Sequence, residues 1–291
     1  DNPYLWEKQN GKFAATSYME VKQKVLNFAG ALCQLGMNKG DRIALLSEGC
    51  NAWVYSELGM LYAGGVNVPL SIKLTDNEIV FRVEHSQARF LIVSANFLSR
   101  VRGIEEQIQG VEKIIVLHSD INEGKYVSFE LLQREGESWR GEHEELLKDR
   151  IHAVTENDLV NISYTSGTTA EPKGIMLSHR NYVTNVLQSD SLIQIPTYYR
   201  ILLFLPWDHS FAHTVGLYSF MYNGASLASV DYGQSGMEYL RNIPVNLQEV
   251  KPHILLSVPA LAKNFRKNIE AGIKAKGCFT DRFYQLGLKI A

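Results

Sequence analysis

The sequence predicts an α/β fold with mainly parallel, doubly wound sheets and helices on both faces. Three observations predict it. Short, continuous apolar segments are typical of strands buried on both faces. These segments alternate with longer ones in which apolar residues recur at helical spacing, the order expected of helices packed on a parallel sheet. Finally, 45% of the 291 residues are hydrophobic, which is a globular composition.

The first half of the chain contains two strong helix-start signals. Ser17 and Glu20 form a capping box before a helix in which apolar residues recur until Gly36 ends it. Thr75 and Glu78 form a second capping box, before a helix that runs to about residue 85. The remaining elements predicted here are a helix at 51–62 and buried strands at 42–46, 66–70, 90–93 and 114–117.

The second half begins with a polar, charged stretch at 119–157, which we interpret as a surface excursion with short helices. The alternation of strands and helices then returns. Strands are predicted at 159–164, 201–205, 226–230 and 254–258, and helices at 180–188, 211–222 and 261–276.

The charge and cysteine content exclude several protein classes. Lys and Arg total 29 against 31 Asp and Glu, so a net charge of −2 gives no electrostatic reason to expect a nucleic-acid partner. Three scattered cysteines offer neither a disulfide framework nor metal-ligand spacing, which favours reduced thiols in a cytoplasmic protein. No apolar run approaches the roughly 20 residues of a membrane span, which leaves room for peripheral membrane contact and for a homo-oligomer.

The sharpest feature is the segment YTSGTTAEPKG at 164–174, which directly follows a predicted strand. Glycines, hydroxyls and consecutive backbone N–H groups in such a loop can bind an anion, and a lysine adds a mobile positive charge. It is not a Walker A loop, because the lysine precedes its glycine and a strand follows where a helix is required. An ordinary polar hairpin loop is the alternative. The predicted phosphate-binding residues are Thr165, Ser166, Gly167, Thr168, Thr169, Lys173 and Gly174.

This segment resembles the phosphate loop of the adenylate-forming superfamily, which includes acyl-CoA synthetases, peptide-synthetase adenylation domains and firefly luciferases. The usual pattern has glycine where this chain has Ala170. Residues 16–21 and 61–70 also resemble segments of that family, in the right order. The resemblance implies two interleaved halves of a large N-terminal domain, with the first helices packed against the last segment.

The segment LPWDHSF at 205–211 resembles the part of this superfamily whose histidine borders the acyl and adenylate sites. By position that histidine is His209, and Trp207 beside it either gates an apolar tunnel or packs in the core. His213 follows His209 at a spacing that can bind metal on a helix, but a packed histidine is the preferred interpretation. Residues 250–260 are most similar to long-chain fatty acyl-CoA synthetases, although Ala260 replaces the usual arginine.

The resemblance implies a two-step reaction. A fatty acid carboxylate attacks ATP to give an acyl-adenylate and pyrophosphate, and coenzyme A then displaces AMP to form a thioester. It also implies Mg²⁺, which Thr168 would approach. Other adenylate-forming enzymes (an aryl-CoA ligase or a peptide-synthetase domain), a non-catalytic nucleotide-binding module and a phosphotransferase remain alternatives.

The family's metal-binding glutamate, ribose aspartate and catalytic lysine are not found in this sequence. The chain also lacks an initial Met and ends within an apolar periodic segment at 283–291. We therefore expect residues 1–291 to be an incomplete large domain without the mobile C-terminal domain, and to be inactive alone.

Overall fold

The computed structural model describes residues 1–165 and 172–290. The chain divides into two compact units, Asp1–Ile254 and Leu255–Ala291, and each is considered by itself. The first unit contains two sheets, one of eight strands and one of four.

The eight-stranded sheet has the strand order β10-β9-β4-β3-β5-β6-β8-β7. Its central strands pair in parallel, and only the edge pairs β9–β10 and β7–β8 are antiparallel. The mainly parallel sheet predicted from the sequence is therefore confirmed. The strands are β3 (Arg42–Leu46), β4 (Val66–Leu70), β5 (Ala88–Ser94), β6 (Lys113–Leu117), β7 (Asn122–Glu123), β8 (Tyr126–Ser128), β9 (Leu159–Thr165) and β10 (Lys173–Ser178).

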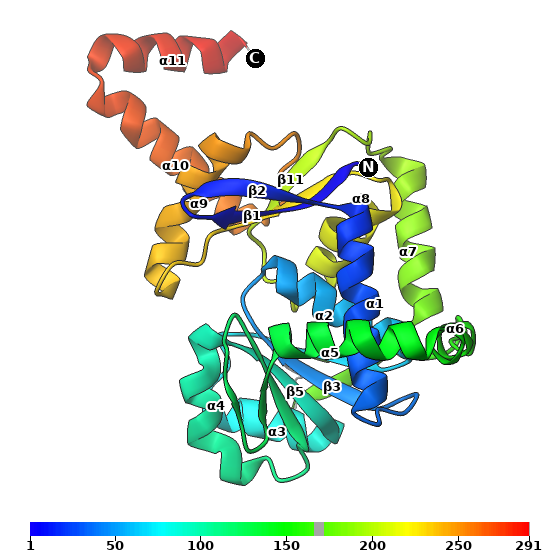
Figure 1. Ribbon diagram of the computed structural model, residues 1–291. Helices are drawn as coiled ribbons and strands as arrows, with labels where there is room; N and C mark the ends of the chain where they lie inside the picture. The colour runs from blue at the N-terminus through cyan, green and yellow to red at the C-terminus, as the bar shows by residue number, and fades with distance from the viewer. Residues whose placement is uncertain (166–171, 291) are drawn as a thin grey trace. The chain divides into compact units, whose positions relative to one another are not determined.

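Helices cover both faces of this sheet (Figure 1). Alternate strand residues pack under α3 (Asp76–Ser86) and α4 (Leu98–Ile104) in one apolar cluster. The residues between them, such as Ile43 and Ile92, are also fully buried. On that second side lie α1 (Tyr18–Gln34), α2 (Asn51–Tyr62) and α5 (Phe129–Glu142), with α1 in contact with both other helices. Helix α2 is apolar around most of its circumference, as expected for a helix buried on all sides.

The four-stranded sheet joins the start of the chain to a much later segment. Its order is β11-β12-β1-β2, where β1 (Pro3–Gln9) and β2 (Lys12–Ser17) form a hairpin beside β11 (Arg200–Leu203) and β12 (Ser226–Ser229). The hairpin turns at Asn10 and Gly11, both with positive φ, as a two-residue type I′ turn requires. The predicted interleaving is thus confirmed, although the hairpin that carries it was not predicted.

The later part of the first unit departs from the sequence prediction in three places. Residues 254–258 do not form a strand, because only Ile254 pairs, through a single parallel bridge to Ile201. The predicted helix at 211–222 is a π-helix, η3 (Ala212–Tyr218), that continues into α8 (Ser219–Tyr222). Helix α9 (Gly236–Val250) was not predicted, and it contains Pro244. The other helices described in this part are α6 (Glu144–His152) and α7 (His179–Leu192). Two short 3₁₀ turns, η1 (Ala95–Phe97) and η2 (Glu105–Gln107), flank α4 earlier in the chain.

The second unit consists of two helices, α10 (Pro259–Ala275) and α11 (Cys278–Ile290). Gly277, at φ +109°, makes the turn between them. Both helices are amphipathic, and the apolar side chains of Phe279, Phe283 and Leu286 on α11 are exposed.

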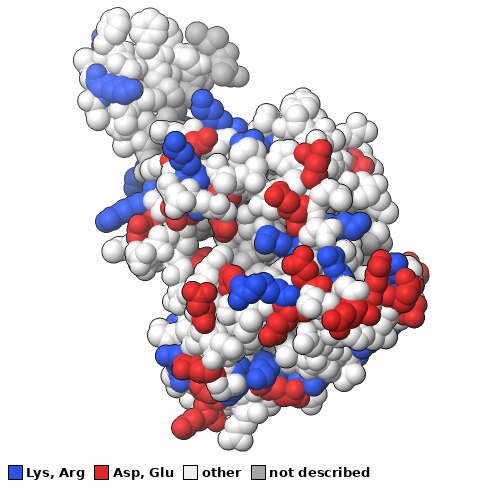
Figure 2. All heavy atoms as spheres, viewed as in Figure 1, with Lys and Arg blue, Asp and Glu red and all other residues white. Residues whose placement is uncertain are grey.

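Acidic and basic side chains are mixed on one face of the molecule. On the face drawn in Figure 2, acidic and basic side chains of the described residues are interspersed, in keeping with the nearly balanced composition. Among the helices of the described residues, none is both long and apolar enough to cross a membrane.

Candidate functional site: the phosphate-loop edge and two adjoining cavities

The predicted phosphate loop connects β9 to β10, which pair at one edge of the eight-stranded sheet. Thr165 pairs with Lys173 and Tyr164 pairs with Gly174 across the two strands. The cross-strand pair brings the Thr165 hydroxyl and the Lys173 ammonium to the same end of the hairpin, and both residues are exposed. Ser166, Gly167, Thr168 and Thr169 lie at 166–171, outside the described residues.

The hairpin is packed tightly where the loop begins. A Cβ at Gly174 would lie 3.0 Å from a methyl carbon of Ile162 and 3.4 Å from the Tyr164 ring, so a glycine leaves room for that ring. The Tyr164 hydroxyl lies 2.8 Å from Nδ1 of His85 on α3. These contacts attach the root of the loop to a helix of the apolar core.

A buried arginine lies beside the same tyrosine. The guanidinium of Arg82 is 5.7 Å from the Tyr164 ring centroid, and the residue is only 7% exposed. Within the part of the chain that the structure describes, Nε and Nη1 of Arg82 have no hydrogen-bond partner, and the nearest ion pair, with Glu78, is long at 3.9 Å. Burial lowers the pKa of Arg82. The sequence prediction missed this residue, although an arginine three positions after buried Ile79, on the same helix face, was a usable signal.

A cavity of about 660 Å³ opens directly beside the hairpin. Thr165 and Ile175 line it from the hairpin, and Ser210 and Phe211 line it from the segment that precedes η3. Helix α7 contributes a row of polar side chains on the third side: Asn181, Asn185, Gln188 and Ser189. The two segments singled out in the sequence, 164–174 and 205–211, therefore meet at one cavity.

Trp207 lies behind this cavity, in the core. It is 4% exposed, its Nε1 donates to the Leu203 carbonyl at 3.2 Å, and its ring meets that of Trp53 edge-on at 5.6 Å. A Cβ at Gly49 would lie 2.3 Å from the Trp207 ring, so the indole occupies the space that a side chain at 49 would need. Of the two interpretations drawn from sequence, the contacts favour core packing.

His209, by contrast, is exposed at the start of the turn into η3. Its Nδ1 accepts from the backbone N–H of Phe211 at 3.3 Å, and its carbonyl accepts from the backbone N–H of His213 at 3.1 Å. The Nδ1 hydrogen bond leaves Nε2 of a neutral ring as the protonated nitrogen and a potential donor. Burial raises the pKa of neighbouring Asp208.

His213 is a packed histidine, as preferred from sequence, and it belongs to a buried polar cluster that the sequence did not predict. Oε1 of Glu57 on α2 lies 2.8 Å from His213 Nε2 and accepts from Asn67 Nδ2 at 2.8 Å and from the Tyr218 hydroxyl at 2.9 Å. Burial and Glu57 raise the pKa of Tyr218 well above its ordinary value. Glu57 is the only charged residue of the mostly apolar helix α2, and this was the one signal in the sequence.

The π-helix explains how two residues of one turn reach the same carboxylate. Residues five apart on an α-helix point about 140° away from each other, because each residue turns the chain by about 100°. A π-helix joins residues five apart by hydrogen bonds, so they lie on one side. His213 and Tyr218 are five apart and both contact Glu57. Such π turns are frequent at functional sites.

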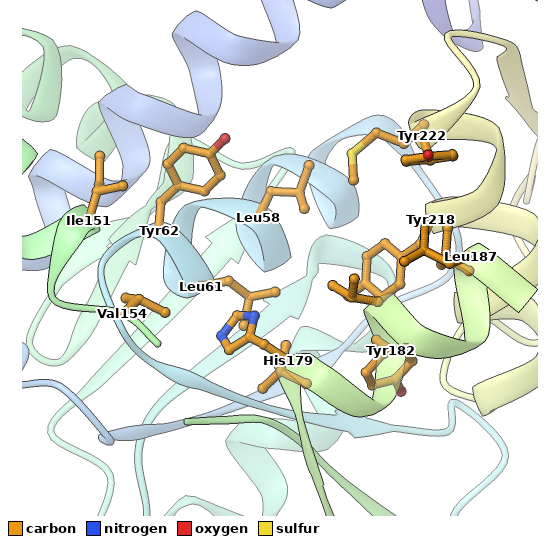
Figure 3. Close-up of a pocket in the computed structure, with 14 residues that line it drawn as sticks. Leu58, Leu61, Tyr62, Ile151, Val154, His179, Tyr182, Leu187, Tyr218 and Tyr222 are labelled. Atoms are coloured by element: carbon orange, nitrogen blue, oxygen red, sulfur yellow. The ribbon is translucent and has the colours of Figure 1, made fainter. Parts of the chain in front are cut away.

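A second cavity, of about 420 Å³, lies on the other side of Tyr182 (Figure 3). Its wall is almost entirely aliphatic and aromatic, with side chains from α2, α6, β9, α7, η3 and α8 and from Val154. In Figure 3 the rings of Tyr62, Tyr182, Tyr218 and Tyr222 surround it. Among the described lining residues, Tyr182 is the one shared by both cavities, and the other α7 residues line one cavity or the other. The cavity at the loop is called the polar cavity for its amide and hydroxyl side chains, and the second one the apolar cavity.

A family model described as AMP-binding enzyme matches residues 4–282. The chain belongs to the AMP-binding enzyme family. The resemblance to adenylate-forming enzymes inferred from the loop is thereby confirmed. The solved structure of the anthranilate CoA ligase AuaEII in complex with anthranoyl-AMP is similar in fold, with a TM-score of 0.71 at 23% identity over 88% of this chain and 46% of that one.

Two curated relatives show how much of a family member this chain spans. It is 24% identical to probable CoA ligase CCL6 of Humulus lupulus, over 97% of this chain and 42% of the relative. It is 23% identical to long chain acyl-CoA synthetase 8 of Arabidopsis thaliana, over 96% of this chain and 40% of the relative. The chain therefore spans less than half the length of these two relatives.

Proposed function

We propose that residues 1–291 form the first part of the large domain of a longer fatty acid–CoA ligase. That ligase would join a fatty acid to ATP as an acyl-adenylate and transfer the acyl group to coenzyme A. The observation that carries the proposal is the meeting of the phosphate-loop hairpin and the 205–211 segment at one cavity. Family membership and the CoA ligases among the relatives support it.

The loop end of the polar cavity would hold the ATP phosphates. In this proposal the backbone and hydroxyls of Thr165, Ser166, Gly167, Thr168, Thr169 and Gly174 surround the phosphates. Lys173 supplies a positive charge, and within the described residues no carboxylate lies at ion-pair distance from its ammonium. Buried Arg82, whose Nε and Nη1 have no hydrogen-bond partner among the described residues, would add a second positive charge that stabilises the root of the loop when an anion binds.

Magnesium would enter with the nucleotide. Around the described ends of the loop, no cluster of three acidic, histidine or cysteine ligands is present, and Thr168 lies outside the described residues. That donor set fits a cation held chiefly by phosphate oxygens and water, as Mg²⁺ usually is, and not a preformed protein cage. Bound Mg²⁺ would neutralise phosphate charge, with the Thr168 hydroxyl beside it.

The acyl group would occupy the cavities on the two sides of Tyr182. In this proposal His209 would border the carboxylate end, because its neighbours Ser210 and Phe211 line the polar cavity. Trp207 would shape this wall from behind, through the segment that it anchors. The apolar cavity falls within the range of about 300–1,000 Å³ typical of small-molecule sites, and its lining suits a hydrocarbon tail. An aryl acid would need only the first cavity.

The test is pyrophosphate release by the full-length protein with ATP, magnesium and a series of fatty and aryl acids. Lys173→Ala should lower ATP-dependent activity about 10- to 150-fold, because a charge-assisted hydrogen bond contributes about 1.5–3 kcal/mol. Lys22→Ala, exposed on α1, is the matched control and should be neutral. Unchanged activity of Lys173→Ala would count against the phosphate role, and transfer of phosphate to the acid would indicate a phosphotransferase.

Substrate length is tested at Tyr182. Tyr182→Ala would remove the one described side chain that lines both cavities and should shift preference toward longer fatty acids, whereas Tyr198→Ala, which changes an exposed tyrosine that lines neither cavity, should not. A preference for benzoate-like acids that Tyr182→Ala leaves unchanged would favour the aryl-CoA ligase.

The 291-residue chain alone should make no acyl-CoA, because the groups of one positioned site act together and the family's remaining groups are expected elsewhere. Formation of acyl-CoA by the 291-residue chain alone would contradict this expectation.

A further inference from the structure

Three potential metal ligands converge at a place remote in sequence from the phosphate loop. They are Glu7 on β1, Cys50 just before α2, and His118 just after β6. The ligand atoms of these three residues all lie within 4.8 Å of one another. We propose that Glu7, Cys50 and His118 bind a zinc ion.

The topology explains why the cluster forms. Strands β3 and β6 run parallel in one sheet, so the loops after them, which carry Cys50 and His118, leave from the same edge. Glu7 belongs to the other sheet and reaches this edge from β1. A metal ion here would therefore link the two sheets of the first unit. The wide separation of the three positions explains why cysteine spacing in the sequence gave no sign of the site.

The carboxylates around these three residues favour the binding of a cation. The three ligands line one cavity of about 510 Å³, together with the carboxylates of Glu48 and Asp231. Glu48 accepts hydrogen bonds only from neutral groups, Ser47, Ser94 and Asn96, among the residues described.

The available positive charge does not offset these carboxylates. Lys8 is the single lysine in the described lining, and it pairs with Glu249 at 2.9 Å. Apart from His118, this lining therefore offers no free cationic side chain to three carboxylates and a thiol. A bound divalent ion would supply the missing positive charge.

The donor set selects the metal. Carboxylate oxygen, thiolate sulfur and imidazole nitrogen together suit zinc better than Mg²⁺ or Ca²⁺, which prefer oxygen ligands alone. Zinc bonds of about 2.0–2.3 Å place tetrahedral ligand atoms about 3.3–3.7 Å apart. The ligand atoms, at most 4.8 Å apart, would therefore need to approach one another by no more than about 1.5 Å, and exposed His118 is the ligand best able to move. Three protein ligands leave the fourth position to water.

The experiment uses the purified chain, stripped with a chelator and titrated with Zn²⁺ by calorimetry and with Co²⁺ by absorption. We expect one equivalent to bind, a sulfur-to-cobalt charge-transfer band and a higher melting temperature with zinc. Cys50→Ser should abolish the band. His118→Asn should weaken binding at least about tenfold, and asparagine tolerates the left-handed backbone of residue 118, at φ +56°.

The controls are Cys278→Ser and His152→Asn, which change exposed residues of the same types and should leave binding unchanged. If Cys50→Ser lowers the stability of the fold, metal binding by His118→Asn, which changes an exposed residue, still tests the proposal. Absence of stoichiometric binding would overturn the proposal. So would undiminished affinity in both Cys50→Ser and His118→Asn.

Discussion

The contact between Trp207 and Gly49 makes a quantitative prediction about the core behind the candidate site. Trp207→Ala should cost about 3–5 kcal/mol of unfolding free energy, the usual range for deleting a buried tryptophan. The upper part of that range is expected for two reasons. The Leu203 carbonyl loses its indole donor, and Gly49 has no side chain that could move into the cavity. For a unit of this size the melting temperature should fall by about 6–20 °C.

The reverse perturbation fills the same space from the other side. In Gly49→Ala the new Cβ would lie 2.3 Å from the Trp207 ring, so the ring or the backbone must shift, at a cost of about 1–3 kcal/mol. In a Trp207→Ala background that clash does not exist, and alanine fills part of the cavity. The loss of unfolding free energy in the double variant should therefore be smaller than the sum of the two single losses. The difference should be about the cost of Gly49→Ala.

The assay is urea denaturation of the four proteins, with Phe211→Ala as the control. Phe211 is 41% exposed, so its removal should cost about 1 kcal/mol or less. Additive effects at 49 and 207 would refute the packing argument. A Trp207→Ala variant as stable as the parent would do so as well, and would return Trp207 to the role of a mobile gate.

Three further predictions concern a helix cap, a buried hydrogen bond and a titrating carboxyl group. Ser17→Ala removes the acceptor for the Glu20 N–H and should cost about 0.5–2 kcal/mol in urea denaturation; no loss would mean that the capping box contributes nothing. Tyr218→Phe removes a donor to Glu57 and should cost about 1–3 kcal/mol, whereas exposed Tyr222→Phe should be neutral, and equal stabilities would contradict the role of the cluster. Burial raises the pKa of Asp208 above 3.8, so the folded state keeps a proton that the unfolded state releases, and this residue's contribution to stability falls as pH rises from 3.8 through the folded pKa. Asp208→Asn should therefore gain stability relative to the parent as pH rises over that window, and a difference independent of pH would argue against the raised pKa.

The features that could be predicted from sequence are those that depend on residues close together in the chain. Strands β3 and β6 are buried on both faces and read as unbroken apolar runs. The capping boxes at Ser17 and Thr75 form because both partners lie within one turn, and the structure contains both. The loop at 164–174 was correctly predicted to join strand to strand, since the residues after Gly174 are strand-forming and Pro172 lies before it.

What was missed depends on partners far along the chain. The β1–β2 hairpin finds its neighbour β12 more than 200 residues later, and only the Asn10–Gly11 turn indicated it. Helix α9 contains Pro244, a residue that disfavours a helix interior, so its local sequence predicts a helix poorly. Residues 254–258 are apolar enough for a strand, but β11 offers a backbone partner only to Ile254.

The most consequential miss is Glu57, because it connects the buried helix to the candidate acyl site. Helix α2 holds the segment after residue 205 at two places: Trp53 meets Trp207, and Glu57 contacts both His213 and Tyr218. The second contact requires the π geometry, since an α-helix would point one of its two partners away from the carboxylate. Tyr218 also lines the apolar cavity, so a change at Glu57 would move a cavity wall without touching a ligand. Under the proposed function, the acyl preference of the full-length protein should therefore depend on a residue that lines neither of the two cavities beside Tyr182, which a motif-based comparison of pocket residues would overlook.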